Sequence, residues 1–410
     1  MKESLEEHRK LGRSIGFQIN AMTTLGVVLM VAIVMSVVAY MSFEALIERG
    51  KSDKFNATGK IGAAIEDQYN TTKLGATWMQ MLILQELESP VEQRNRAFVL
   101  DFINAALETG PNLNGVGVIF EPNAFDGKDA AMAGTEFGDS AGRLSMYVSR
   151  SSGLSTLTNV EEQEWYKTPK QTQKAHLSEP HFYNDNGKKV LLITLSFPIM
   201  QNGKFLGTIV MSINVNNLQD ALAQISSKEE FYALFTENGT IVANGLNPDR
   251  IMENYYTGAG TTPEEIARIF DDSEYSEIKK SKTTGEQSVF VFSPLHLDGV
   301  DAQWALLSAT EYDVFVGKAK HMILVCVGIS ILCTILLTAL LTLFIHKRIA
   351  DPIGALSGMI ANFARLDMRA ENNTRIHEFL ERTDEIGIIA HELRRMANAM
   401  REMIGKINGA

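Results

Sequence analysis

A dense group of aromatic and ionisable side chains lies between Glu161 and Tyr183, in a stretch without membrane character. Trp165 and Tyr166 are adjacent, and His176 and His181 follow in the same stretch. An aromatic ring stacked on a small molecule supplies contact area, while hydroxyl or imidazole groups at its edge fix the orientation of that molecule. The stretch therefore predicts a binding site for a small ligand. The alternative is that Trp165 and Tyr166 are core aromatics and that the nearby lysines form a solvated helix face.

Small polar residues in two later apolar runs extend the predicted site. Residues 190–200 and 204–215 are rich in β-branched side chains, and the Gln201-Asn202-Gly203 sequence between them is typical of a hairpin turn. Because alternate residues of a strand share one face, Thr194, Ser196, Thr208, Ser212 and Asn214 can point into one space. The predicted ligand-binding residues are Tyr147, Arg150, Trp165, Tyr166, His181, Tyr183, Asp185, Thr194, Ser196 and Ser212.

No catalytic or metal-binding sequence competes with this interpretation. The chain has eight histidines, but no HExxH, GxSxG or Walker-type sequence. His176 and His181 lack the i, i+4 spacing of a helical metal pair, which disfavours a zinc site made with Glu179. We predict no enzymatic activity, no cofactor and no metal. The net charge of -11 over 410 residues argues against nucleic-acid binding.

Two apolar runs without a charged residue, 21–43 and 322–345, are each long enough to cross a membrane core of about 30 Å. The first run is too long for a typical signal peptide and is interpreted as an uncleaved anchor. Basic residues lie before the first run and after the second, which favours placing both chain ends in the cytoplasm. Both cysteines, Cys326 and Cys333, lie in the second run, where we expect them to be packing residues.

The predicted fold class is an α+β membrane protein. We expect a cytoplasmic tail (1–20), a first membrane helix (21–43), an extracytoplasmic region (44–321), a second membrane helix (322–345) and an inner segment. Within 44–321, a long helix runs to about Leu87, and strands begin after a second helix that Pro90 opens. Two strand pairs place a proline at the same point, Pro198 and Pro294, which predicts two related antiparallel modules.

The extracytoplasmic region resembles the double Cache sensor domains of bacterial transmembrane receptors. The resemblance rests on Trp165-Tyr166, on Ser178-Glu179-Pro180-His181-Phe182 and on the paired strands ending at Val215-Asn216-Asn217-Leu218. It implies a long helix beside two PAS-like modules, a distal one over about 90–218 and a proximal one over about 228–315, with the ligand in the distal one.

Amino-acid-binding members of that family carry an Arg, two Tyr and an Asp where this chain has Gln163, Thr158, His181 and Ser212. The residues that would clamp an α-carboxylate and an α-ammonium are therefore missing. His176 and His181, with Lys167, Lys170 and Lys174, favour an anionic or uncharged ligand instead.

The inner segment contains two amphipathic helical patterns. Ile353, Leu356, Ile360 and Phe363 form one apolar seam, and a polar stretch from Asp367 to Thr383 follows. The second seam alternates spacings of three and four: Ile386, Ile389, Leu393, Met396, Met400, Met403 and Ile407. Such seams predict a coiled coil that needs a second chain.

The segment resembles a HAMP domain over 346–404, with Pro352 near the start of the first helix and Asp384-Glu385-Ile386-Gly387 at the start of the second. The resemblance implies that Pro352, Glu385 and Gly387 serve signal transmission. Leu366 replaces the glycine usual before the connector. Residues 405–410 would begin an output coiled coil. The alternative is a plain dimerising stalk.

Together these features predict the sensory half of a homodimeric receptor in the bacterial inner membrane, most like a methyl-accepting chemotaxis receptor. It would bind a small-molecule ligand and act on cytoplasmic signalling partners if an output domain follows. We expect the sequence to be a fragment or a natural short form. The alternatives are the sensory half of a histidine kinase or diguanylate cyclase, and a membrane-anchored binding protein without signalling output.

Overall fold

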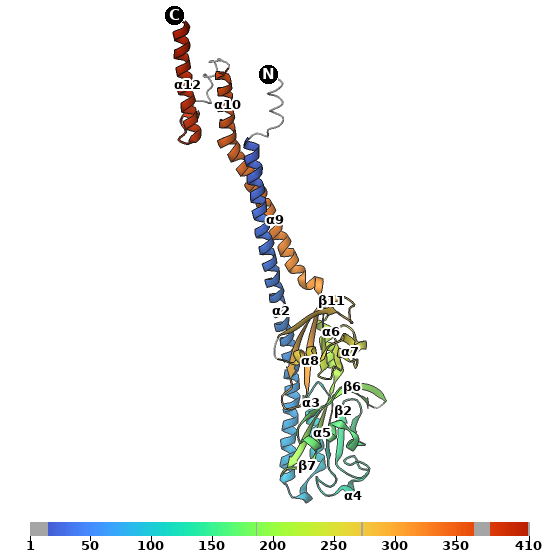
Figure 1. Cartoon of the computed structure of the whole chain (residues 1–410). Helices are drawn as coiled ribbons and strands as arrows, with labels where there is room; N and C mark the ends of the chain where they lie inside the picture. Colours follow the sequence, from blue (N-terminus) through green and yellow to red (C-terminus); the bar gives the residue numbers. More distant parts are fainter. Residues whose placement is uncertain (1–14, 186, 272–273, 365–377, 409–410) are drawn as a thin grey trace. The chain divides into compact units, whose positions relative to one another are not determined.

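The computed structural model describes residues 15–185, 187–271, 274–364 and 378–408. The chain divides into two compact units: Leu46–Lys318, and a second unit drawn from the segments before and after it. The first unit holds two antiparallel sheets and the helices that cover them (Figure 1). The predicted α+β class is confirmed.

One helix, α2 (Ile15–Glu88), accompanies both sheets of the first unit (Figure 1). Its buried residues Met79 and Ile83 share a core with one sheet, and Ile61 packs against the same core, which extends to residues of the other sheet. The Gln80 side chain donates to the Pro198 carbonyl at 2.6 Å, and the Tyr69 hydroxyl donates to the Asp298 carbonyl at 2.9 Å. The predicted long helix is therefore confirmed, and apolar and polar contacts attach it to both modules.

The first sheet, here called the distal sheet, has seven strands in the order β3-β2-β1-β7-β6-β4, with β5 also paired to β6. Its strands are β1 (Leu113–Phe120), β2 (Ser145–Ser149), β3 (Gly153–Ser155), β4 (His176–Leu177), β5 (His181–Asp185), β6 (Lys188–Gln201) and β7 (Lys204–Asn214). A two-residue turn with positive φ at Asn202 and Gly203 joins β6 to β7, as the sequence predicts.

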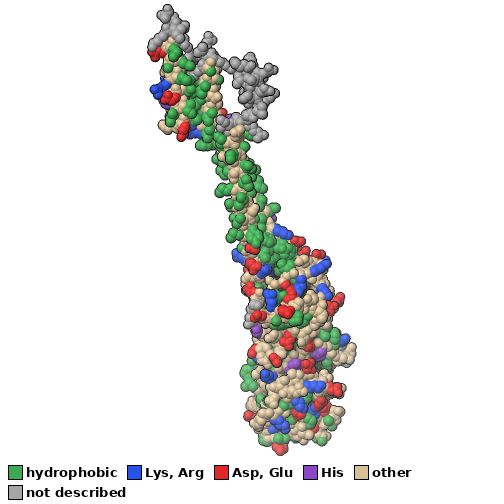
Figure 2. Space-filling view, in the orientation of Figure 1, with side chains coloured by type: hydrophobic (Ala, Val, Ile, Leu, Met, Phe, Trp, Pro, Cys, Tyr) green, Lys and Arg blue, Asp and Glu red, His purple; other side chains and the backbone are tan. Residues whose placement is uncertain are grey.

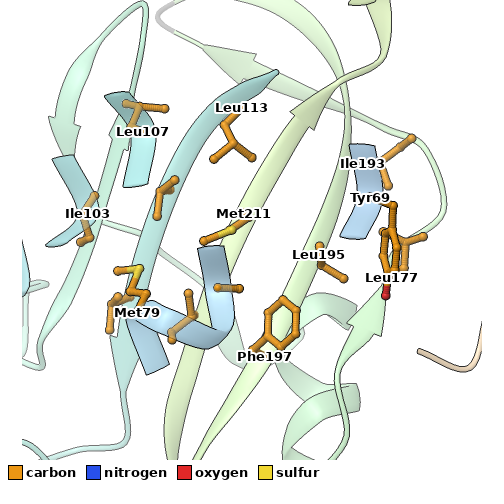
Figure 3. Packing of buried hydrophobic residues seen from close by; sticks show 14 of the residues in the cluster. Tyr69, Met79, Ile103, Leu107, Leu113, Leu177, Ile193, Leu195, Phe197 and Met211 are labelled. Atoms are coloured by element: carbon orange, nitrogen blue, oxygen red, sulfur yellow. The ribbon is translucent and has the colours of Figure 1, made fainter. Parts of the chain in front are cut away.

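One face of the distal sheet packs against α2 and α3 (Arg96–Thr109), which follows the short helix η1 (Val91–Gln93). Figure 3 shows part of this core, in which Met211 and Leu195 of the sheet lie near Met79 of α2 and Ile103 of α3. The other face is partly covered by α5 (Glu164–Thr172) and by the short helix η2 (Val160–Glu162). The short helix α4 (Asp129–Met132) is bonded to Arg96 of α3 through Asp129.

The second sheet, here called the proximal sheet, follows α6 (Val215–Ile225) and has the order β10-β11-β12-β8-β9. Its strands are β8 (Glu230–Thr236), β9 (Ile241–Asn244), β10 (Tyr275–Lys280), β11 (Gln287–His296) and β12 (Gln303–Glu311). The helices beside it are η3 (Pro248–Arg250), α7 (Tyr255–Ala259) and α8 (Pro263–Phe270). The distal order β2-β1-β7-β6 has its counterpart in β9-β8-β12-β11, so the predicted repeat is present in the strand order.

The second unit contains α9 (Tyr312–Ile345), the π-helical segment η4 (His346–Ala350), α10 (Asp351–Phe363) and α12 (Glu385–Asn408). Two helices, within Phe17–Glu88 and Tyr312–Asn362, are long and apolar enough to cross a membrane. Hydrophobic side chains dominate the surface of this stretch (Figure 2). Most of the predicted polar connector, including Leu366, lies outside the described residues.

A buried ion-pair group holds the segment between β1 and β2. The Arg96 guanidinium of α3 bonds both oxygens of Asp126, at 2.8 and 2.9 Å, and Asp129 at 2.7 Å. All three side chains are at most 9% exposed. Burial alone would favour the neutral acid, but the hydrogen bonds from Arg96 and from the Lys128 backbone lower the pKa of Asp126. Arg96, which precedes Asp126 by 30 residues, thus holds this segment in one arrangement.

Replacing Arg96 with Ala is expected to lower the free energy of unfolding by about 3–5 kcal/mol, because two carboxylates would stay buried without a cation. Urea denaturation of Leu46–Lys318 measures this change. Lys51→Ala, which removes a solvent-exposed pair with Glu48, serves as the matched control and should cost less than about 1 kcal/mol. Equal losses for both variants would contradict the analysis.

The lowered pKa of Asp126 also predicts a pH dependence. A depressed folded-state pKa stabilises the fold above the unfolded value, 3.8, and this contribution is lost as the pH falls through the folded-state pKa. Unfolding measured between neutral pH and about pH 2 should therefore show a loss of stability on the acid side that is smaller in Arg96→Ala. An identical acid profile in both proteins would contradict the assignment.

Candidate functional site

The distal sheet presents small polar side chains on the face turned away from α2. Register places Thr194 opposite Ser212, Ser212 opposite Gly115, and Gly115 opposite Ser149. A second row runs from Ser196 through Val210 to Gly117 and Tyr147, and a third contains Thr208 and Ser145. We call this surface the polar face: Ser145, Tyr147, Ser149, Thr194, Ser196, Thr208 and Ser212. All seven residues are buried, so the three strands β2, β6 and β7 deliver hydroxyl groups to one buried surface.

The edge strand β5 adds an imidazole and a phenol to the polar face. His181 Nε2 lies 3.5 Å from Thr194 Oγ1, and His181 Nδ1 lies 3.1 Å from the Glu179 carbonyl. The rings of Tyr183 and Tyr147 are tilted by 59° with centroids 5.8 Å apart. Of the predicted site residues, the structure therefore brings together Tyr147, His181, Tyr183, Thr194, Ser196 and Ser212.

Two glycines of β1 make room for the Tyr147 ring. A Cβ at Gly115 would lie 2.3 Å from the Tyr147 hydroxyl, and one at Gly117 would lie 2.9 Å from the ring. Any side chain at these two positions would displace the ring, so the close approach requires glycine. Glycines spaced by two in a predicted strand are a signal that the sequence analysis did not use.

One hydroxyl of the polar face lacks a hydrogen-bond partner among the described residues. Thr208 is fully buried, and its Oγ1 has no acceptor or donor within the described part of the chain. A buried polar group left unpaired costs about 1–3 kcal/mol. By contrast, Ser196 donates to the His176 carbonyl and Ser145 to the Leu157 carbonyl. Thr208 is therefore a hydroxyl of this face whose bonding capacity is still available.

Trp165 and Tyr166, on α5, lie at one end of the polar face in a small apolar cluster. Tyr166 is 1% exposed and packs with Ile119 and Val160, while Trp165 is half-buried at the margin. The Tyr166 hydroxyl donates to Glu121, and burial together with this bond raises the pKa of Tyr166. The aromatic pair thus has the packing of core residues and closes the polar face at this end.

One predicted residue, Arg150, lies apart from the polar face in its contacts. Arg150 donates to the carbonyls of Leu107, Leu113 and Gly110, at 2.6, 2.8 and 2.9 Å. Its guanidinium therefore caps the C-terminal end of α3, where a cation is favoured. Asp185 ends β5, and its side chain lies outside the described residues.

The positive charges near α5 do not converge on the polar face. Lys167 and Lys174 are exposed, and Lys170 pairs with Glu121 at 2.6 Å. Burial lowers the pKa of His176, outweighing the nearby Glu164, and so favours the neutral imidazole. The charge-based expectation of an anionic ligand therefore loses most of its support, whereas that of an uncharged ligand keeps it.

The three predicted transmission residues lie at helix starts in the second unit. Pro352 is buried in the first turn of α10, and Glu385 begins α12. A Cβ at Gly387 would lie 2.0 Å from the Arg382 carbonyl, so only glycine fits there.

Comparisons with known proteins place this site in a sensor domain. Residues 99–220 match the first PDC sensor domain of methyl-accepting chemotaxis protein-like proteins. The methyl-accepting chemotaxis protein TlpQ of Pseudomonas aeruginosa is 24% identical over 242 residues, which are 53% of this chain and 33% of TlpQ. This match thus covers about a third of the length of that relative.

Solved sensor domains share the fold. The periplasmic sensory domain of the Campylobacter jejuni chemoreceptor Tlp1 superposes with a TM-score of 0.54 at 14% identity, covering 66% of this chain and 98% of that domain. The extracellular domain of mmHK1S-Z3, described as a histidine kinase, also has a TM-score of 0.54, at 20% identity, over 68% of this chain and 98% of that domain. The predicted resemblance to the Cache-type sensor of bacterial chemoreceptors is confirmed.

The core position of Tyr166 predicts a loss of stability on truncation. Tyr166→Ala should lower the free energy of unfolding by about 3–5 kcal/mol, because a buried ring leaves a cavity. Tyr166→Phe keeps the ring, loses the bond to Glu121 and should cost only about 1–2 kcal/mol. Urea denaturation of Leu46–Lys318 distinguishes the two. Unchanged stability in Tyr166→Ala would show that the ring is not a core element.

Proposed function

We propose that this chain is the sensory and transmitting part of a bacterial inner-membrane receptor whose distal module binds a small ligand on the polar face. The observation that carries the proposal is a difference between two sheets of the same topology. The distal sheet turns hydroxyl groups away from α2, whereas the proximal sheet turns aromatic and aliphatic side chains the same way.

The proximal face supports the assignment by contrast. Its buried residues include Phe231, Phe235, Phe290, Phe292 and Leu307. The Phe235 and Tyr255 rings stack with centroids 4.7 Å apart, so this face is a filled core. Unpaired polar groups are costly in such a core, whereas hydroxyl groups on the distal face can exchange their partners for those of a ligand. The distal module is thus the binding module of the proposal.

The chemistry of the polar face favours an uncharged, hydrogen-bonding ligand. No ionised side chain is among the seven residues of the polar face, and several charged side chains near its rim are paired with each other. The Arg143 guanidinium bonds Asp139 and Glu161, and Lys170 bonds Glu121. His181 adds an imidazole that can donate a hydrogen bond, so an anionic ligand is the second candidate.

The inner helices support a homodimer. In one chain, α10 and α12 bury Leu356, Met359, Ala390, Leu393 and Ala397 against each other. Five residues of the predicted seams are between 37% and 63% exposed: Ile353, Ile360, Ile389, Met396 and Met403. Leu356 and Leu393 are thus the seam residues buried within the described part of the chain, and a second copy packing on the exposed seam residues would complete a four-helix bundle.

A second apolar surface agrees with a second copy. A groove of about 800 Å³ runs between α2, α3 and α6 within the first unit. Along α2, its rim exposes Leu74, Trp78 and Leu82 at 56%, 58% and 39%. An exposed stripe of this kind on a long helix is typical of helix pairing. In this proposal, signal transmission through the HAMP-like segment requires the homodimer.

The proposed receptor has more than one candidate output. A methyl-accepting chemotaxis receptor is favoured by the match over residues 99–220. A histidine kinase or diguanylate cyclase is the alternative, because the fold is shared with the extracellular domain of a protein described as a kinase. The coding sequence after codon 410 separates them: a long Ala/Glu/Gln-rich hairpin supports a chemoreceptor, an H-box a kinase and a GGDEF sequence a cyclase.

A thermal-shift screen of Leu46–Lys318 against nucleobases, polyols, amides, amino acids and carboxylates tests the site. We expect a hit among the uncharged compounds, with affinity reduced about tenfold by Thr194→Val or Thr208→Val through the loss of one hydrogen bond. Thr310→Val, a buried strand residue of the proximal module, is the matched control and should leave the affinity unchanged. A hit insensitive to both distal variants would remove the site from the polar face.

Disulfide crosslinking in membranes tests the dimer. In a chain whose Cys326 and Cys333 are replaced by Ser, Ile389→Cys should form a covalent dimer on mild oxidation, because this seam residue is 45% exposed within one chain. Arg395→Cys lies off the seam with a 79% exposed side chain and should crosslink far less. Equal yields at both positions, or none at either, would contradict the bundle and favour a monomeric anchored binding protein.

A further inference from the structure

The turn between α9 and α10 contains a backbone carbonyl that the helix cannot satisfy in the usual way. Pro352 has no N–H, so the carbonyl four residues earlier, that of Arg348, loses the donor that an α-helix would provide. The helix widens just before this point: η4 is π-helical, and the Asp351 N–H donates to His346, five residues back. Such π segments are frequent at functional sites in helices.

The missing donor comes from the segment that precedes α12. Arg382 Nη2 donates to the Arg348 carbonyl at 3.0 Å, across 34 residues of sequence. The same Nη2 bonds Asp384 Oδ2 at 2.5 Å, and Arg382 Nε lies 3.1 Å from Asp384 Oδ1. A guanidinium can make these bonds at once because its N–H groups form a fixed planar fork.

Asp384 connects this guanidinium to α12. It precedes the first residue of the helix, and its Oδ1 accepts the Gly387 N–H at 3.2 Å, which is an N-cap bond. The hydrogen bond from Arg382 lowers the pKa of Asp384 to about 2, so the pair is ionised at neutral pH. The Arg348 carbonyl, Arg382, Asp384 and the start of α12 thus form one continuous set of bonds.

We infer that Arg382 is the residue that couples the end of the second membrane-spanning helix to the start of α12, through the Arg348 carbonyl, whose i+4 donor is missing because residue 352 is proline. The inference rests on the proposed function, in which the inner segment transmits the signal. A rotation or shift of the helix before Pro352 moves this acceptor, and the bond to Arg382 is then kept or lost. If the bond between Arg382 and the Arg348 carbonyl is kept, the movement shifts Asp384 and the N-cap of α12. If the bond is lost, the N-cap is no longer connected to the preceding helix.

An ordinary surface ion pair within α12 provides the comparison. Arg395 bonds Glu392 at 3.0 Å within one turn, and both side chains are more than 60% exposed. Such pairs contribute little and connect nothing beyond their own helix. Arg382 differs because its side chain is 18% exposed and it bonds a second segment.

Hydrogen–deuterium exchange of the full chain in lipid nanodiscs tests the inference. We expect Arg382→Ala to speed exchange about tenfold in peptides covering 346–363 and the first turn of α12, as for the loss of a charge-assisted hydrogen bond. Arg382→Lys should give exchange rates between those of the unmodified chain and Arg382→Ala, because an ammonium cannot reproduce the planar fork of the guanidinium. Arg395→Ala should leave 346–363 unchanged.

The Pro352→Ala background separates this role from a merely structural ion pair. Alanine restores an N–H donor for the Arg348 carbonyl, so adding Arg382→Ala should then change exchange in 346–363 less than about twofold. The effect on the first turn of α12 should persist, since Asp384 still loses its partner. An Arg382→Ala effect on 346–363 that is absent, or equally large in both backgrounds, would overturn the inference.

The exchange measurement requires neither a bound ligand nor an output domain. A failed ligand screen therefore leaves this test intact, and a failed exchange test leaves the proposed receptor function standing.

Discussion

The architecture of the first unit depends on one helix serving as the second layer of two sheets. A sheet with an apolar face must bury that face against another element, and here α2 does so for both modules. Polar contacts add direction to this packing: Gln80 donates to the Pro198 carbonyl of the distal sheet, and Lys54 bonds Glu230 at the start of the proximal sheet. Because packed cores are close to incompressible, either sheet can move against α2 only by changing discrete contacts.

Because α2 covers one face of each sheet, the residue types on the opposite faces can differ between the two sheets. The two sheets have the same central strand order, yet one presents Ser, Thr and Tyr side chains and the other a packed aromatic group. Topology therefore does not distinguish the two modules. The alternation of residue types along the strands distinguishes them, because a change of residue type at every second position alters one face and leaves the core against α2 intact.

In the inner segment, a backbone carbonyl without its usual helical donor connects two elements. A helix that contains proline cannot pair all its carbonyls, and the Arg348 carbonyl becomes an attachment point for a side chain from a distant part of the sequence. The glycine of the Asp-Glu-Ile-Gly sequence has a steric reason in the same place, since the Arg382 carbonyl fills the space that a Cβ at Gly387 would need. The motif is thus a set of backbone requirements as well as a pattern of charges.

Several features could be predicted from sequence because their signals are local. The absence of charge over more than twenty residues predicts a membrane-spanning helix, and an Asn-Gly pair between β-branched runs predicts the hairpin of β6 and β7. Alternation alone placed Thr194, Ser196 and Ser212 on one face, and the structure agrees. Each of these signals lies within one continuous stretch of sequence, so it can be recognised without knowledge of neighbouring elements.

Only the tertiary structure decided the partners of side chains that contact residues distant in sequence. Sequence placed Arg150 in the binding site, but its guanidinium caps α3, and Tyr166 closes the polar face as a core residue. The Arg96 group joins residues at least 30 positions apart, and no local pattern marks it. The physical reason is that a charge or an aromatic ring satisfies any suitable neighbour, and only the packing of strands and helices determines which neighbour lies within reach.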